Sequence, residues 1–327
     1  MNSDNTRMRA VVIPEFGEAE VLRVERMPVP EPGPGEVAID VAHAGANFAE
    51  VLYRRGVVDV PLPFVPGIEV AGHVRAVGKG VTGLAVGQPV AALTIVGSGG
   101  YAEVVVTSAA LVAPLDGLDL GLDVAAALPS NSTTAFLVLE RVARLAPGER
   151  VLVHAAAGGV GSQLGQVARL LGAGRVVGTV GGEAKIETAR GFGYDEVILR
   201  DRLAEAGEFD VVVDMVGGPA RAASLERLAP MGRLVVMGNA SGAEDVGLPA
   251  NHLWFTNRTV SGFNLAAFSA AFPEEAGRAL RRAVRAAADG TLRVRVETLP
   301  LELAADAHRR IESGRTTGKL VLDVAAS

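Results

Sequence analysis

The chain has no cysteine, few aromatic residues and no long apolar run. Its 327 residues include 1 Trp, 3 Tyr and 10 Phe. The absence of cysteine excludes disulfides and every thiolate metal site, whereas histidine and carboxylate sites stay open. No segment approaches the ~20 uninterrupted apolar residues that span a membrane, and residues 1–9 lack a hydrophobic signal segment. We therefore expect a cytoplasmic protein with no membrane partner.

The charge balance is mildly acidic. The formal net charge is −6 and the sequence pI is about 5.5, which argues against nucleic acid as a partner. Hydrophobic residues make up 49% of the chain, enough to bury a large core, and the length favours two domains.

The most informative segment is VLVHAAAGGVG, which ends at Gly161. A strand at 151–154 leads directly into a glycine loop that opens a helix, which is how free helix N–H groups cradle a dinucleotide pyrophosphate. Gly158 is expected to let the backbone approach the phosphates, and Gly161 to let the helix pack closely. Helix 162–171 and strand 175–180 would complete a β-α-β unit. A tight turn without a ligand is the structural alternative.

The glycine pattern departs from G-x-G-x-x-G at its first position, which is Ala156. Alanine restricts φ, so we expect the turn to avoid a positive φ at this residue. No Gly-Lys-Ser/Thr follows, which excludes a phosphate-transfer loop.

The residue pattern changes twice along the chain. Residues 10–115 contain short β-branched runs cut by Pro and Gly, typical of a barrel-like β module, with strands clearest at 37–43 and 102–106. Strand and helix then alternate, as a doubly wound parallel sheet requires, with strands expected at 151–154, 176–180, 196–198, 211–214 and 234–237. After residue 263, an amphipathic helix near 274–288 precedes short strands that would fold back onto the first module.

These patterns predict an α/β protein in three segments. The expected segments are 1–123 for the first part of a β-barrel domain, 124–262 for a Rossmann domain, and 263–327 for a return segment that completes the first domain.

Several motifs together resemble one family. The segments are GANF at 45–48, PGIEVAG at 66–72, AAAGGVG at 155–161, GNASG at 238–242 and SGRTTGKLVL at 313–322. They look like the medium-chain dehydrogenase/reductases, and most like their zinc-free quinone oxidoreductase branch, which includes zeta-crystallin-like proteins. The resemblance implies a GroES-like barrel built from both chain ends, a central Rossmann sheet and a cleft that holds a nicotinamide.

The branch is also indicated by the chemistry of the expected metal site. In zinc-dependent relatives the ligands stand at positions matching Asn47 and Ile68, and neither residue type is a good zinc ligand here. Glu69 alone cannot make a site, and His43 and His73 are expected to be structural. Without a metal, reduction of a conjugated acceptor is favoured over alcohol oxidation.

The resemblance also implies a set of site residues. Asn47 would lie beside the nicotinamide and substrate as the candidate catalytic residue, unless it only pins a loop. Thr134 would lie near the carboxamide, or serve only as a helix-entry residue; Lys319 would lie near the pyrophosphate, or cap a strand end in solvent. A tyrosine acid is not expected, because Tyr53 is offset from the family position. The other expected cofactor contacts are Gly158, Gly159, Val160, Gly181, Lys185, Arg200, Gly238, Asn239, Phe263 and Asn264.

The end of the second strand favours NADPH over NADH. An NAD-selective site places a carboxylate where this chain has Val180, followed by Gly181. Lys185 and Arg200 stand where zinc-free relatives hold the 2′-phosphate, although Glu183 would oppose an anion. The alternative is that both cations are only surface charges.

Three functions follow as hypotheses. The leading one is an NADPH-dependent, zinc-free reductase of quinones or α,β-unsaturated carbonyl compounds. An enoyl-thioester reductase is the second, and an NADPH-binding structural or regulatory protein with little turnover is the third. We also expect a homodimer, in which the edge strand at 258–262 pairs with its twin.

Overall fold

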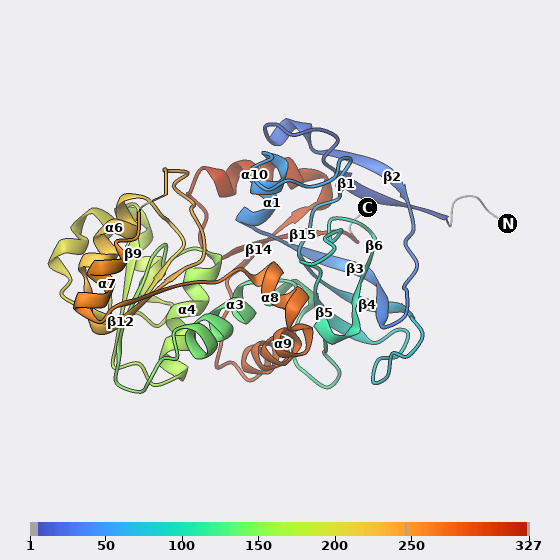
Figure 1. The fold of residues 1–327 in the computed structure, drawn as a ribbon. Helices are drawn as coiled ribbons and strands as arrows, with labels where there is room; N and C mark the ends of the chain where they lie inside the picture. The colour runs from blue at the N-terminus through green and yellow to red at the C-terminus, as the bar shows by residue number, and fades with distance from the viewer. Residues whose placement is uncertain (1–5, 246, 326–327) are drawn as a thin grey trace. The chain divides into compact units, whose positions relative to one another are not determined.

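The computed structural model describes residues 6–245 and 247–325, which form two compact units. Unit 1 consists of Met1–Thr133 with Leu265–Ser327, and unit 2 of Thr134–Asn264. Figure 1 shows the course of the chain through both. Within the described residues, no helix is both long and apolar enough to cross a membrane.

Unit 1 is built on a seven-stranded sheet. Its order is β14-β15-β3-β4-β5-β7, with β6 also paired to β3, and β1 and β2 form a separate antiparallel ribbon. The bounds are β1 (Arg7–Val12), β2 (Arg23–Pro28), β3 (Glu36–Ala46), β4 (Glu69–Val77), β5 (Pro89–Leu93), β6 (Val104–Ser108), β7 (Val112–Pro114), β14 (Val296–Pro300) and β15 (Lys319–Asp323).

Both ends of the chain contribute to this sheet. β15 runs antiparallel to β3, with Leu320 opposite Ala46, and β14 runs parallel to β15. The strands bury one apolar cluster that includes Ile39, Val70 and Leu322. The return segment therefore completes the GroES-like domain.

The helices of unit 1 are short except for one. They are α1 (Phe48–Arg54), α2 (Leu122–Ala125), α8 (Leu265–Ala271), α9 (Pro273–Ala288) and α10 (Ala304–Glu312), while α3 (Asn131–Leu137) spans the boundary between the units. The 3-10 turns η2 (Ala19–Val21), η3 (Ala109–Leu111) and η7 (Leu301–Leu303) connect strands and helices. α9 confirms the amphipathic pattern, since Leu280, Ala283 and Val284 are buried.

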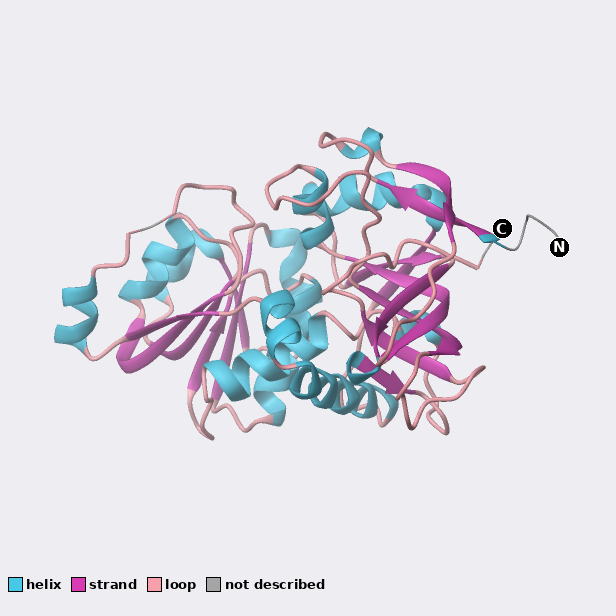
Figure 2. Cartoon of the chain, turned by 45° about the vertical axis from the view of Figure 1, so that its right-hand side comes forward, coloured by secondary structure: helices cyan, strands magenta, loops and turns pink. Residues whose placement is uncertain are grey.

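Unit 2 is a doubly wound parallel sheet. The strand order β10-β9-β8-β11-β12-β13 is that of a Rossmann fold, and Figure 2 shows the strands as a twisted fan. The strands are β8 (Arg150–Val153), β9 (Arg175–Val180), β10 (Glu196–Leu199), β11 (Phe209–Asp214), β12 (Leu228–Val236) and β13 (Thr259–Gly262). The helices are η4 (Val138–Val142, π-helical), α4 (Gly159–Leu170), η5 (Glu183–Lys185), α5 (Ile186–Arg190), η6 (Arg200–Glu205), α6 (Pro219–Glu226) and α7 (Ala250–Thr256).

Several expected bounds differ from the structure. α4 begins at Gly159 instead of 162, because the glycines belong to its first turn, and β12 begins well before 234. Unit 2 begins at Thr134 instead of 124, because α2 packs against β3, β4 and β5 of unit 1.

The turn between β8 and α4 has the expected close approach. Gly161 has no room for a side chain, since a Cβ there would lie 2.2 Å from the carbonyl oxygen of Ala155. Ala155 has a positive φ of 52° in this turn. Ala156 has no positive φ, which confirms the prediction for that residue. The first turn of α4 is thereby held against the end of β8.

Candidate active site

In unit 1 the start of α1 is fixed by a buried carboxylate. The backbone N–H of Asn47 donates to Oε2 of Glu50 over 2.9 Å, and the N–H of Ile68 donates to Oε1 of the same carboxylate over 3.1 Å. Glu50 is fully buried, and this burial raises its pKa to about 7, although the Lys319 ammonium opposes the shift. Glu50 therefore joins the start of α1 to the start of β4.

The side chain of Asn47 is bonded at both ends. Lys319 donates to Asn47 Oδ1 and forms an ion pair with Glu69, while Asn47 Nδ2 donates to Glu69 Oε1 over 2.9 Å. The other oxygen of Glu69 accepts from the backbone N–H of Ser130 over 2.7 Å. The structure thus brings together two of the expected site residues, Asn47 and Lys319, which stand 272 positions apart in the chain.

Two of the alternatives can now be decided. Lys319 does not cap a strand end in solvent, since its side chain is only 3% exposed. Thr134 is not a helix-entry residue, because it lies inside α3. A contact of Lys319 with the pyrophosphate, of Thr134 with the carboxamide and of Asn47 with substrate all stay predictions.

The cation bound between Asn47 and Glu69 is the ammonium group of Lys319. Ile68, which is 2% exposed, binds the Glu50 carboxylate through its backbone N–H, and its side chain has no atom that could bind a metal. Among the residues that the structure describes, no group of three His, Cys, Asp or Glu could hold a metal ion. His73 is exposed on β4, and His43 lies on β3 with its Nδ1 lacking a hydrogen-bond partner. The hydrogen bond expected of a structural histidine is therefore absent at Nδ1 of His43, and the structural role of His73 stays a prediction.

Tyr53 is a poor proton donor. Its ring packs edge-on against Phe64, with the centroids 5.6 Å apart, and burial raises its pKa to about 12.

In unit 2 the expected cofactor residues gather at one edge of the sheet. Each follows the carboxyl end of a parallel strand, and these ends meet at the same edge, where open α/β sheets bind ligands. The residues are Gly158, Gly159 and Val160 after β8, Gly181 after β9, Arg200 after β10, Gly238 and Asn239 after β12, and Phe263 and Asn264 after β13.

Arg200 lies beside Gly181, the residue that follows β9, and Lys185 lies close enough for the charge of Arg200 to act on it. The Arg200 guanidinium nitrogens lie 3.6 and 3.7 Å from the place that a Cβ on Gly181 would occupy, and its buried Nε has no hydrogen-bond partner. Burial lowers the pKa of Lys185, and the charge of Arg200 lowers it further. Burial also lowers the pKa of Arg200, which Asp214 partly offsets. A lysine whose pKa is lowered by a neighbouring arginine lies in a positive environment, which favours a bound anion.

A buried histidine that sequence reasoning did not predict as a site residue lies next to this edge. His154 follows β8, and its ring nitrogens lie 2.7 Å from Thr179 Oγ1 and 2.7 Å from Ser224 Oγ. Burial lowers the pKa of His154 to about 4, so the ring is neutral near pH 7. His154 therefore links β8, β9 and α6. Its place in an apolar strand gave no signal that distinguished it from a core residue.

The buried carboxylate of Glu50 gives a pH prediction. Its pKa is about 7 in the folded chain and 4.5 when exposed, so its stabilising contribution is full below pH 4.5 and is lost as the pH rises through 7. We expect the free energy of unfolding of the wild type, relative to Glu50→Gln, to fall by about 3 kcal/mol between pH 4.5 and 7. Urea unfolding at several pH values measures this difference. Glu25→Gln, on the exposed ribbon strand β2, is the control. If the free-energy difference between the wild type and Glu50→Gln did not change with pH, the prediction would be contradicted.

Comparisons with known proteins agree with this fold. A family model described as "Alcohol dehydrogenase GroES-like domain" matches residues 33–117, and one described as "Zinc-binding dehydrogenase" matches residues 192–322. A quinone oxidoreductase of Pseudomonas syringae pv. Tomato DC3000 superposes with a TM-score of 0.89 at 33% identity, covering 97% of this chain and 100% of that one.

Two further relatives bear on the chemistry. An Escherichia coli quinone oxidoreductase complexed with NADPH superposes with a TM-score of 0.87 at 30% identity, covering 97% of this chain and 99% of that one. The pikromycin polyketide synthase component PikAII of Streptomyces venezuelae is 36% identical over 94% of this chain, which spans only 8% of that protein.

The matched domains, the Rossmann strand order and the ammonium-centred cluster lead to one conclusion. The chain belongs to the medium-chain dehydrogenase/reductase family of oxidoreductases, as a member of its zinc-free quinone oxidoreductase branch.

Proposed function

We propose that the protein is an NADPH-dependent, zinc-independent reductase that transfers hydride to quinones or α,β-unsaturated carbonyl compounds. The observation that supports this best is a pair of interacting cations: Arg200, which lies beside Gly181 after the second Rossmann strand, and Lys185, whose pKa the charge of Arg200 lowers. The Escherichia coli relative complexed with NADPH supports the same cofactor.

The residues fit the proposed cofactor. The Arg200 guanidinium over Gly181, with its buried, unpartnered Nε, suits a 2′-phosphate, and Val180 provides no carboxylate to repel the phosphate. N–H groups of Gly159 and Val160 would bind the pyrophosphate, and Gly158, whose own N–H donates to the carbonyl oxygen of Ala155 over 2.9 Å, would let the backbone approach it. Gly238, Asn239, Phe263 and Asn264 would line the nicotinamide end in unit 2. The expected roles of Thr134, Asn47 and Lys319 toward the cofactor stay predictions from the sequence.

When bound, NADPH supplies a hydride to the acceptor carbon. The chain's own part is electrostatic, because the acceptor oxygen gains negative charge that fixed donors and cations stabilise. In unit 1, Lys319 holds the Asn47 amide in one orientation and neutralises the buried Glu69. We assign Asn47 the catalytic position, with Lys319 and Glu69 holding it.

Enoyl-thioester reduction is the second candidate. It is favoured by the similarity to PikAII, although the chain spans only 8% of that protein. The third hypothesis, an NADPH-binding structural or regulatory protein, predicts binding with little turnover. A cytoplasmic location stays a prediction from the sequence.

One set of assays tests the proposal. Steady-state NADPH oxidation is followed with a simple quinone, an enone and an enoyl thioester, each with and without a chelator. We expect turnover with the quinone or the enone and no effect of the chelator. Turnover with the thioester alone would favour the second candidate, and binding without turnover the third. Activity lost on removal of one tightly bound zinc per chain would refute zinc independence.

The two cations give a prediction on cofactor selectivity. A charge-assisted hydrogen bond contributes roughly 1.5–3 kcal/mol, so Lys185→Ala or Arg200→Ala should lower kcat/KM for NADPH by roughly 10- to 150-fold. The value for NADH should stay nearly unchanged, because NADH lacks the 2′-phosphate, and Val180→Asp should shift preference toward NADH.

Arg190→Ala is the matched control, since Arg190 is an exposed cation on the adjacent helix α5 that pairs only with Glu187. It should leave both values unchanged. Equal losses for NADPH and NADH in the Lys185 and Arg200 variants, or a wild type that prefers NADH, would contradict the assignment.

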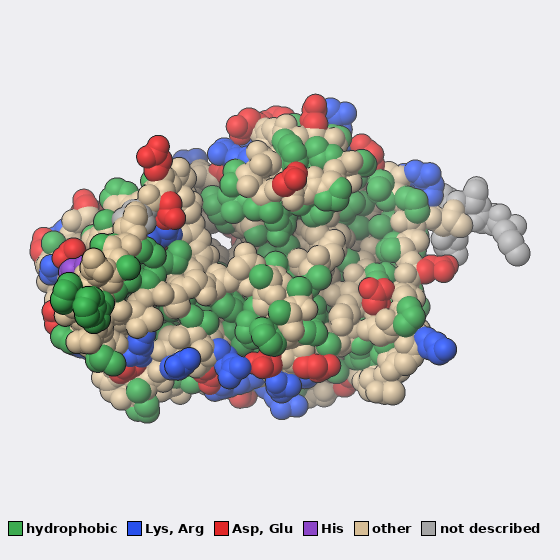
Figure 3. All heavy atoms as spheres, in the orientation of Figure 1, with side chains coloured by type: hydrophobic (Ala, Val, Ile, Leu, Met, Phe, Trp, Pro, Cys, Tyr) green, Lys and Arg blue, Asp and Glu red, His purple; other side chains and the backbone are tan. Residues whose placement is uncertain are grey.

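We also propose a homodimer that forms through β13. β13 is the edge strand of the unit 2 sheet, and the preceding helix α7 exposes Trp254 and Phe255, which stack with centroids 4.6 Å apart. Their exposed fractions are 71% and 72%, and Figure 3 shows hydrophobic side chains gathered over α7. An unpaired edge beside an apolar surface favours pairing with a second copy.

The edge geometry allows a specific test. The N–H of Phe263 donates to Val236 of β12, so by strand alternation the N–H of Val260 faces away from β12. Val260→Pro removes one outward donor and should shift the protein toward monomer, whereas Val260→Thr, which keeps the donor, should not. Light scattering at micromolar concentration should give a wild-type mass of twice 33.6 kDa, and a mass near 33.6 kDa would refute the dimer.

A further inference from the structure

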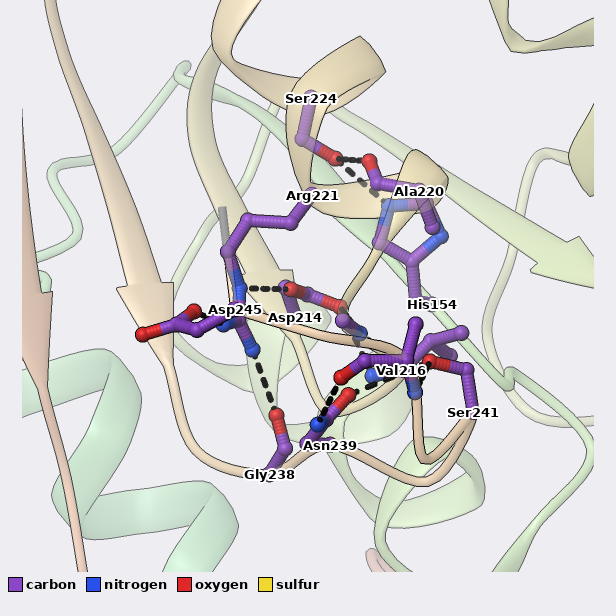
Figure 4. A network of polar contacts seen from close by, with 12 residues as sticks. His154, Asp214, Val216, Ala220, Arg221, Ser224, Gly238, Asn239, Ser241 and Asp245 are labelled. Atoms are coloured by element: carbon purple, nitrogen blue, oxygen red, sulfur yellow. Dashed lines mark hydrogen bonds and ion pairs between the residues drawn. The ribbon is translucent and has the colours of Figure 1, made fainter. Parts of the chain in front are cut away.

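The turns that follow β11 and β12 are joined by a buried arginine (Figure 4). Asp214, at the end of β11, is fully buried, and its Oδ1 accepts from the N–H groups of Val216 and Gly217 over 2.8 and 3.0 Å. Its Oδ2 accepts from Nε of Arg221 over 2.9 Å. Arg221 lies on α6, and its side chain is 6% exposed. The arginine therefore neutralises a carboxylate that already holds the turn after β11.

The two remaining guanidinium nitrogens reach the other turn. Nη2 of Arg221 donates to the carbonyl oxygen of Gly238 over 2.7 Å, and Nη1 donates to Oδ1 of Asp245 over 2.7 Å. A role limited to neutralising Asp214 would need neither of these two donors, because Nε already binds that carboxylate. Figure 4 shows the guanidinium directed at Asp214, Gly238 and Asp245 together.

The loop of residues 238–245 also fits closely onto the turn after β11. Gly217 has φ 78°, and a Cβ there would lie 2.1 Å from Oδ1 of Asn239. The N–H groups of Ala240 and Ser241 donate to the carbonyl oxygens of Met215 and Val216 over 3.0 and 2.9 Å. The position of Gly238 and Asn239 is therefore set by the residues around Asp214 and Arg221.

We propose that Arg221 is a positioning residue for the cofactor, acting through the backbone of Gly238 and Asn239. The inference rests on the proposed function, in which these two residues line the nicotinamide end at the carboxyl edge of the sheet. Arg221 fixes the carbonyl of Gly238 and holds the loop on the Gly217 turn. Its three hydrogen bonds go to Asp214, Gly238 and Asp245, and none goes to Lys185 or Arg200 on the 2′-phosphate side of the proposed site.

The three bonds of Arg221 are not equal. The Asp245 side chain is 84% exposed, so solvent screens this ion pair and it contributes little. The bonds to Asp214 and Gly238 involve the buried part of the network. Of the three, the Gly238 bond is therefore the buried one that reaches the loop, where it adds to the backbone bonds of Ala240 and Ser241.

Two nucleotides separate this role from a purely structural one. Adenosine 2′,5′-bisphosphate probes only the phosphate side of the site, whereas NADPH probes both ends. Lysine at position 221 keeps the charge beside Asp214 but cannot reach all three partners. We expect Arg221→Lys to weaken NADPH binding by about 5- to 20-fold, measured by fluorescence titration, and to leave binding of the bisphosphate within about twofold of the wild type.

Two further variants complete the test. Asp245→Asn removes the exposed ion pair with Arg221 and should bind both nucleotides as the wild type does. Asp214→Asn combined with Arg221→Met leaves no buried charge unpaired, so it keeps the test open if Arg221→Lys fails to fold. Because the charge of Asp214 also acts on Arg200, bisphosphate binding is the reference for this variant, and its loss of NADPH affinity should exceed any change for the bisphosphate by about 5- to 20-fold.

Unchanged NADPH binding in the Arg221 variants, or an equal loss for both nucleotides, would overturn the positioning role. A wild type that binds the bisphosphate and not NADPH would also overturn it. A wild type that binds neither nucleotide would refute the proposed function itself.

Discussion

The close approach of α4 to the turn after β8 is the constraint on which the nucleotide-binding edge of unit 2 depends. A Cβ on Gly161 would lie 2.2 Å from the carbonyl oxygen of Ala155, and Ala155 itself takes a φ of 52° to make the turn. With α4 held there, its first N–H groups lie at the carboxyl edge of the sheet. The turns after β9, β10, β11 and β12 meet the same edge because the strands are parallel. A dinucleotide site is the chemistry that this arrangement supports.

The corresponding part of unit 1 is held together by a buried ammonium group between polar side chains. Lys319 binds Glu69 and Asn47, and Glu50 ties the N–H groups of Asn47 and Ile68 together. These bonds hold α1, β4 and β15 at one point. A pKa of about 7 for Glu50 shows how strongly burial acts there. Removing either partner of such a buried pair leaves an uncompensated charge, so the cluster is a strong positional constraint.

The sequence predicted the parts of the fold that follow local rules. Strand 175–180 is correct to the residue, since β-branched residues run between a glycine and two more glycines. The strand expected at 102–106 lies at 104–108, because the bridge of Ala102 to Ala10 precedes it. The contact of Asn47 with Lys319 and the bond of Arg221 to Gly238 had no local signal, since each joins residues distant in the chain. Tertiary packing alone decides such pairs.

The central claim is that Lys185 and Arg200 form a site for a 2′-phosphate. Isothermal titration of the wild-type protein with NADPH and with NADH, at several salt concentrations, tests it most directly. The account predicts that NADPH binds roughly 10-fold or more tightly than NADH, and that this advantage shrinks as salt screens the two cations. Equal affinities at every salt concentration, or tighter binding of NADH, would contradict it.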